Sequence, residues 1–95
     1  MTDLLDVPLT RSPEAVGSEV ADELVLLHLT NGIYYGLNSL GTRIWQLLGT
    51  GMSPRAICAE LADEFEVPVG IIENDARSFL ADLMAQGIVT EGEIS

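Results

Sequence analysis

The spacing of hydrophobic residues changes near the middle of the chain and divides it into two halves. Val7 and Leu9 alternate with other residues in 6–11, and 23–29 and 33–37 are short apolar runs. From about residue 39 onward, apolar positions recur at a spacing of three or four residues, which is typical of amphipathic helices. The pattern predicts strands followed by helices, an α+β fold of winged helix-turn-helix type.

The strongest local signal lies between the two apolar runs, where the sequence reads Asn31-Gly32. Both residues tolerate a positive φ, so the pair predicts a hairpin with a two-residue type I′ turn. Strand pairing about that turn sets Leu29 opposite Tyr34. One face then carries Leu24, Leu26, His28, Ile33, Tyr35 and Leu37, and the other carries Val25, Leu27, Leu29 and Tyr34.

Three antiparallel strands are expected before the first helix, at about 6–11, 23–29 and 33–37. Pro8 lacks an N–H, which assigns the first of them to an edge or a strand start. Residues 1–5 are expected to be a loose end, and the polar stretch 12–22 a loop. The chain is expected to form one domain over 1–95, with an ordered part of about 6–90.

Three helices follow, each with recognisable end signals. The first is expected at about 39–48, capped by Asn38 or Ser39, and the second begins at Ser53-Pro54. The third extends from about 70 or 71 to 86, and Gly87 is suited to follow its end. The predicted buried stripes are Leu40, Ile44, Leu47 and Leu48; then Ala56, Ile57, Leu61 and Phe65; then Ile72, Ala76, Phe79 and Leu83.

Charge excludes some classes of partner. The chain has 95 residues and a formal net charge of −11, from fifteen acidic residues against four arginines. Binding to phosphate backbones or anionic membranes depends on Lys and Arg, so neither nucleic acid nor a membrane is an expected partner. The acidic N-terminus lacks the basic region of a signal peptide, and the cytoplasm is the expected location.

No catalytic or metal-binding constellation is apparent. His28 is the one histidine, and a half-buried side chain that bonds a neighbour is its simplest role. Cys58 is the one cysteine, so it forms neither an internal disulfide nor a thiolate metal cluster. The chain is therefore expected to be a binding module, without enzymatic activity, metal or cofactor.

A longer motif resembles the PqqD-like family, the recognition elements of pathways that modify ribosomally made peptides. It consists of the stretch Gly32-Ile33-Tyr34-Tyr35-Gly36-Leu37-Asn38, then Gly41, Ile44-Trp45 and a helix start Gly51-x-Ser53-Pro54. The resemblance covers about 22–89. It implies a winged-helix-like domain that binds the leader segment of a precursor peptide and presents it to a protease, a cyclase or a radical SAM enzyme, as in quinone-cofactor or lasso-peptide biosynthesis.

The resemblance also implies a binding site. In the family the leader adds as a strand to the third strand, in a groove between that strand and the third helix. The residues agree with such a groove, because an exposed strand edge can pair with a peptide. The candidate contacts are Ile33, Tyr34, Tyr35, Gly36 and Leu37 on the strand, with Ile71, Asp75, Ser78, Phe79 and Asp82 on the helix. For Asp75 and Asp82, a solvated helix face is the alternative.

Two other functions fit parts of the sequence. A winged-helix regulatory or DNA-binding domain has the same order of elements, but the third helix contains Arg77 among several acids. An acyl-carrier-like protein is also small and acidic with a Ser-Leu pair, yet Ser39 is explained as a helix cap. The second face of the hairpin is predicted to bind the modifying enzyme or a second copy, unless the segment around Val7 and Leu9 covers it.

Overall fold

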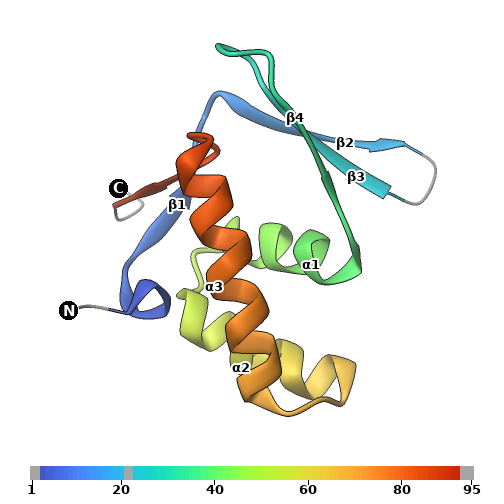
Figure 1. The fold of residues 1–95 in the computed structure, drawn as a ribbon, viewed down its shortest axis with the longest axis vertical. Coiled ribbons are helices and arrows are strands. Elements are labelled where there is room, and N and C mark those ends of the chain that lie inside the picture. Colours follow the sequence, from blue (N-terminus) through green and yellow to red (C-terminus); the bar gives the residue numbers. More distant parts are fainter. Residues whose placement is uncertain (1–2, 21–22, 93–95) are drawn as a thin grey trace.

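The computed structural model of the chain describes residues 3–20 and 23–92, which form an α+β fold with most strands before the helices. The predicted fold class is confirmed. Figure 1 shows the sheet β2–β3–β4 above the helices, with α3 along the centre of the view. In chain order the elements are the 3₁₀ turn η1 (Leu4–Asp6), β1 (Leu9–Arg11), β2 (Ala15–Val20), β3 (Glu23–His28), β4 (Tyr34–Leu37), α1 (Ser39–Leu48), α2 (Pro54–Phe65), α3 (Val69–Ala85) and β5 (Val89–Glu91).

The three-stranded antiparallel sheet has the order β2-β3-β4, so β3 is central and β4 is an edge. The stretch expected to be a loop thus contains β2, and that expectation was wrong. Its sequence Ala-Val-Gly-Ser-Glu-Val does alternate, but five of its six residues are exposed, which gives it the polar character of a loop. Ala21 and Asp22, the end of the predicted loop, lie outside the described residues.

The β3–β4 hairpin has a longer connection than the predicted two-residue turn. His28 donates its N–H to the carbonyl of Ile33 and accepts at its own carbonyl from the N–H of Gly32, which leaves 29–32 as the loop. Leu27 is therefore opposite Tyr34, where the type I′ turn would place Leu29. The shift is by two residues, so each side chain stays on its predicted face.

The loop is held by local side-chain bonds that the Asn-Gly rule does not consider. The imidazole Nδ1 of His28 accepts from the N–H groups of Thr30 and Asn31, at 3.2 and 3.4 Å. The Asn31 side chain accepts from the N–H of Ile33, at 3.0 Å. Gly32 has φ +73°, and no other residue of this loop has a positive φ. Buried His28 thus has the structural role expected of it.

The N-terminal segment belongs to the core. Leu5 is fully buried in η1. The strand predicted at 6–11 was expected to join the main sheet, but the observed strand β1 pairs with β5 instead. The Asp3 carboxylate accepts from Arg77 at 2.7 Å and pairs with Arg55, and its bond to Arg77 lowers the pKa of Asp3 well below the ordinary value. The loose end predicted for 1–5 is wrong for residues 3–5, and residues 1–2 lie outside the described part.

The helix ends follow the predicted signals. The Asn38 side chain caps α1 by accepting from the N–H of Gly41 at 2.8 Å, and Ser53 caps α2 ahead of Pro54. Ala56 and Phe65, expected in the buried stripe of α2, are exposed, and Pro54 and Cys58 are buried instead. On α3, Leu80, expected to pack inward beside the central stripe, is buried, whereas Phe79, expected within that stripe, is half-buried.

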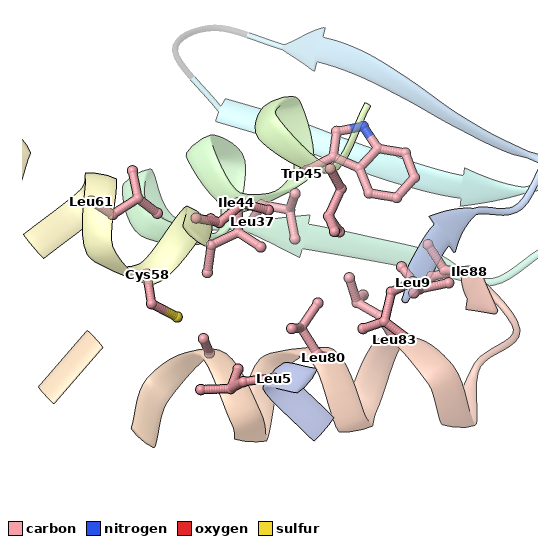
Figure 2. Close-up of a cluster of buried hydrophobic side chains, with 14 of the residues drawn as sticks. Leu5, Leu9, Leu37, Ile44, Trp45, Cys58, Leu61, Leu80, Leu83 and Ile88 are labelled. Carbon is pink, nitrogen blue, oxygen red and sulfur yellow. The ribbon is translucent and has the colours of Figure 1, made fainter. Parts of the chain in front are cut away.

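One hydrophobic core joins the helices to the inner face of the sheet, and Figure 2 shows part of it. Leu24, Leu26 and Leu37 of the sheet are buried in the same cluster as Ile44 and Trp45 of α1. Figure 2 shows Leu37 beside Ile44. Gly17 lies close to this layer, because a Cβ there would be 3.3 Å from Leu24 and 3.5 Å from the Trp45 indole nitrogen. The guanidinium of Arg11 lies 4.8 Å from the centre of the Trp45 ring.

A glycine substitution distinguishes the observed loop from a type I′ turn, because the loop has one residue with a positive φ and the turn would have two. An added Cβ meets open space at both Gly32 and Gly36, but only Gly32 has a left-handed φ. Replacement of Gly32 by Ala should lower the free energy of unfolding by about 1 kcal/mol, because an L-residue is strained at that φ. Chemical denaturation measures the change.

Gly36→Ala is the matched control and should be neutral or slightly stabilising, because it reduces the entropy of the unfolded chain. Asn31→Ala should remove the two bonds of the Asn31 side chain, from the N–H of Ile33 and to the carbonyl of Gln86, without strain. If Asn31→Ala and Gly32→Ala lowered the free energy of unfolding equally, and by more than the loss of side-chain bonds explains, residues 31 and 32 would both have a positive φ. That result would indicate the two-residue type I′ turn.

Candidate functional site

The outer edge of β4 is the first component of the candidate site. β4 pairs with β3 on one side, and in the described part of the chain no strand pairs with it on the other. Unpaired backbone groups on a strand edge can bind another extended chain. β4 contains no charged residue, whereas the other edge strand of this sheet, β2, contains Glu19.

The pairing pattern shows which backbone groups of β4 are available. The N–H of His28 bonds the carbonyl of Ile33, so this opposed pair is of the hydrogen-bonded kind. Hydrogen-bonded and non-hydrogen-bonded pairs alternate along an antiparallel ladder, so Leu26–Tyr35 is a hydrogen-bonded pair. The pairs on either side of it, Leu27–Tyr34 and Val25–Gly36, are of the non-hydrogen-bonded kind. Tyr34 and Gly36 therefore direct their N–H and C=O groups away from β3, toward the free edge.

A cavity of about 330 Å³ lies beside this edge, between β4, α1 and α3. Leu40, Ile44 and Phe79 contribute apolar surface, and polar groups come from α3, from Asn38 and from the Tyr35 hydroxyl. The complete lining is Tyr35, Asn38, Leu40, Gly41, Ile44, Asp75, Ser78, Phe79 and Asp82. Its volume suits one or two side chains of an extended peptide better than a large cofactor.

Tyr35 connects β4 to α3 across this cavity. Its ring meets the ring of Phe79 edge-on, with centroids 6.2 Å apart, and its hydroxyl donates to the Asp82 carboxylate at 3.3 Å. Partial burial and the Asp82 carboxylate raise the pKa of Tyr35, because both disfavour a phenolate. The hydroxyl thus stays protonated at neutral pH and remains a hydrogen-bond donor.

Gly41 brings α1 close to Phe79. A Cβ at residue 41 would be 3.2 Å from the Phe79 ring and 3.3 Å from the capping oxygen of Asn38. The helix cap and the aromatic floor of the cavity are therefore packed against each other. Four lining residues were not among the contacts predicted from the sequence: Asn38, Leu40, Gly41 and Ile44. A glycine in the first turn of a helix was a usable signal for them.

The structure brings half of the predicted contacts together in the cavity. Tyr35 and four residues of α3 line it: Asp75, Ser78, Phe79 and Asp82. Ile33, Tyr34, Gly36 and Leu37 form the strand edge and its ends without lining the cavity. Ile71 is 53% exposed one turn before Asp75 and does not line it.

A second hollow, of about 600 Å³, lies at the C-terminal end of β4, where Leu37 and Asn38 are part of its lining. Polar side chains dominate its lining, and the Arg43 guanidinium there binds the Glu64 carboxylate through two bonds of 2.8 Å. Cys58 is buried, which raises the pKa of its thiol. Over 3–20 and 23–92, no group of three or more His, Cys, Asp or Glu residues is placed to hold a metal ion, and no described helix has the length and apolarity to span a membrane.

The comparison with protein families is decisive for classification. The model of PqqD, coenzyme PQQ synthesis protein D, matches residues 23–89, from the start of β3 to the first residue of β5. This chain belongs to the PqqD family. The match includes the edge strand β4 and all three helices, so the candidate site lies within the family's region.

Two solved structures resemble most of this PqqD-family chain. One is described as TbiB1 in complex with the TbiA(beta) leader peptide; it is 36% identical, with a TM-score of 0.79, over 90% of this chain and 99% of that one. The other is a lasso peptide synthetase B1 complexed with the leader peptide, 28% identical with a TM-score of 0.79, over 87% and 98% of the two chains. None of the curated proteins gives a significant match.

The contact between Tyr35 and Asp82 predicts a measurable ionisation. In a Tyr34→Phe background, Tyr35 is the one tyrosine left, and its pKa is expected above the ordinary value. Adding Asp82→Asn should lower that pKa, because the amide keeps an acceptor oxygen but removes the negative charge. Titration followed by tyrosinate absorbance measures the shift.

Asp75→Asn in the same background is the control, since Asp75 lines the cavity without a bond to Tyr35. Asp75→Asn should change the pKa of Tyr35 less than Asp82→Asn does. A pKa that is insensitive to Asp82→Asn would mean that the Tyr35 hydroxyl does not point at α3.

Proposed function

We propose that this protein is a recognition element that binds the leader segment of a ribosomally made precursor peptide and presents that peptide to a modifying enzyme. The observation that carries the proposal is the unpaired, uncharged edge of β4 beside a cavity that is part apolar and part polar. Family membership and the two leader-peptide complexes among similar structures support the same function.

Strand addition explains how affinity arises without a deep pocket. The outward groups of Tyr34 and Gly36 offer two donors and two acceptors to an extended peptide. Gly36 has no side chain, and an added Cβ there would meet nothing within 4 Å, so the outer face beside this part of the free edge is uncovered. The peptide backbone would extend the sheet from three strands to four.

The cavity then accounts for selectivity. In an added strand, alternate side chains point to the same face as Tyr35, toward α3. The apolar surface of Leu40, Ile44 and Phe79 favours an apolar residue of the leader, and Asp75 and Asp82 at the helix wall favour neighbouring Lys or Arg over Asp or Glu. A leader with acidic residues at those positions should bind more weakly.

The chemical step belongs, in this proposal, to the partner enzyme. A protease, a cyclase or a radical SAM enzyme would modify the core of the precursor while the leader stays on β4. A winged-helix DNA-binding role is disfavoured, because Arg77, the one basic residue of α3, is engaged with the Asp3 carboxylate.

The test uses a synthetic leader from the precursor open reading frame nearest to the gene of this chain. Gly36→Pro removes an outward N–H without breaking a bond to β3, and it should weaken leader binding at least about tenfold in calorimetry. Gly36→Ala keeps the N–H and should bind within about twofold of the wild type.

Circular dichroism and thermal unfolding establish that both variants fold. If Gly36→Pro does not fold, leaders that are N-methylated at successive amides replace it, and alternate positions should lose binding. Equal binding by the proline and alanine variants, or loss that does not alternate along the leader, would contradict strand addition at β4.

A further inference from the structure

The outer face of the sheet, opposite the helices, is an apolar surface that nothing in the described part of the chain covers. Side chains on this face come from alternate positions of β2, β3 and β4 and from the first loop residue after β3. Four of them are large, apolar and exposed: Val16 at 41%, Val20 at 61%, Leu29 at 60% and Tyr34 at 73%. Val25 and Leu27 lie between them, half-buried.

The sequence offered the segment around Val7 and Leu9 as one possible cover. The structure excludes it, because Leu9 is 6% exposed in β1, which pairs with β5, and Val7 packs against the core. Figure 1 shows β1 at the side of the molecule, away from the outer face. Exposed apolar groups concentrated on one face in this way are typical of an interface.

Charge indicates the chemistry of the missing partner. Glu23 pairs with Val20 at one end of this face, and the N–H of Leu29 bonds the carbonyl of Glu14 at the other end. Both acids therefore occupy positions on the outer face, separated by about six residues of strand or ~20 Å. The surface is thus an apolar strip with a negative charge at each end.

Each of the four arginines of the chain is engaged elsewhere. Arg11 lies over Trp45, Arg43 binds Glu64, Arg55 binds Asp6 of η1, and Arg77 binds Asp3, the cap residue of η1. A second copy would bring the same acidic ends together, with a formal charge of −11 on each chain. Electrostatics therefore favours a different protein, whose apolar patch is flanked by Lys or Arg.

We propose that the outer face of β2–β3–β4 is the docking surface for the modifying enzyme, through an apolar patch with basic residues at both ends. The inference rests on the proposed function for the identity of that partner. Tyr34 connects the two surfaces, because its side chain lies on the outer face and its backbone N–H points to the free edge of β4. An enzyme bound here would lie directly beside the leader.

The test replaces valine by the isosteric threonine on β2, the strand farthest from the leader edge. The full chain carrying Val16→Thr and Val20→Thr should bind the leader within about twofold of wild type, yet bind the purified protease or cyclase encoded beside its gene at least about tenfold more weakly. Biolayer interferometry measures the enzyme, and calorimetry measures the leader. Val69→Thr is the matched control, since Val69 is 44% exposed on α3, and it should change neither affinity.

Charge is tested separately with Glu23→Lys. Association with the enzyme should slow, and its dependence on salt should weaken, whereas Asp63→Lys on the exposed side of α2 should have little effect. Unchanged enzyme affinity in the double threonine variant would overturn the proposal. So would a dimer in sedimentation velocity that the double variant dissolves, because the occupant would then be a second copy.

Failure of the proposed function gives a different result. If wild type binds neither leader nor enzyme, the recognition function is wrong. If it binds the leader and no encoded enzyme, the docking surface alone is wrong.

Discussion

The central position of β3 is the constraint on which the rest of this structure depends. A strand has two edges, and β3 uses one for β2 and the other for β4, so β4 keeps an unpaired edge. The helices cover one face of the sheet, where Leu24, Leu26 and Leu37 are buried in one cluster with residues of α1. This arrangement leaves three surfaces uncovered, and each has a proposed role: the edge of β4, the cavity next to it and the outer face of the sheet.

The two adjacent tyrosines divide these roles between them. Tyr35 points inward, contacts Phe79 and Asp82 of α3, and so holds the cavity in place beside the edge. Tyr34 points outward and is 73% exposed. Because backbone direction and side-chain direction both alternate along a strand, Tyr34 also directs its N–H toward the free edge. The order of two residues thus determines which surface each one serves.

Signals that act within a few residues were sufficient to predict the helices and the faces of the hairpin. The caps Asn38 and Ser53, and the period-two pattern of 23–29, depend on neighbouring residues alone. The hairpin register was wrong because His28 and Asn31 bond the loop backbone and favour a longer connection than Asn-Gly implies. The register differs from the prediction by two residues, an even number, so the predicted inner and outer faces were correct.

The remaining errors involve contacts between distant parts of the chain. Leu5 is buried and Asp3 bonds Arg77, 74 residues away, and no local pattern reveals either. β2 appeared to be a loop because one of its faces is open to solvent and the other includes Gly17 against Trp45. For the same reason the α3 wall of the site was predicted from helical spacing, but its partners on α1 were not.

Amide hydrogen exchange with and without the synthetic leader tests the central claim most directly, because it reports on single backbone N–H groups. The account predicts that the N–H groups of Tyr34 and Gly36 become protected when the leader binds, while those of Tyr35 and Leu37, already bonded to β3, change little. Protection of Gly17 and Glu19, which face the free edge of β2, or no selective protection within β4, would contradict it.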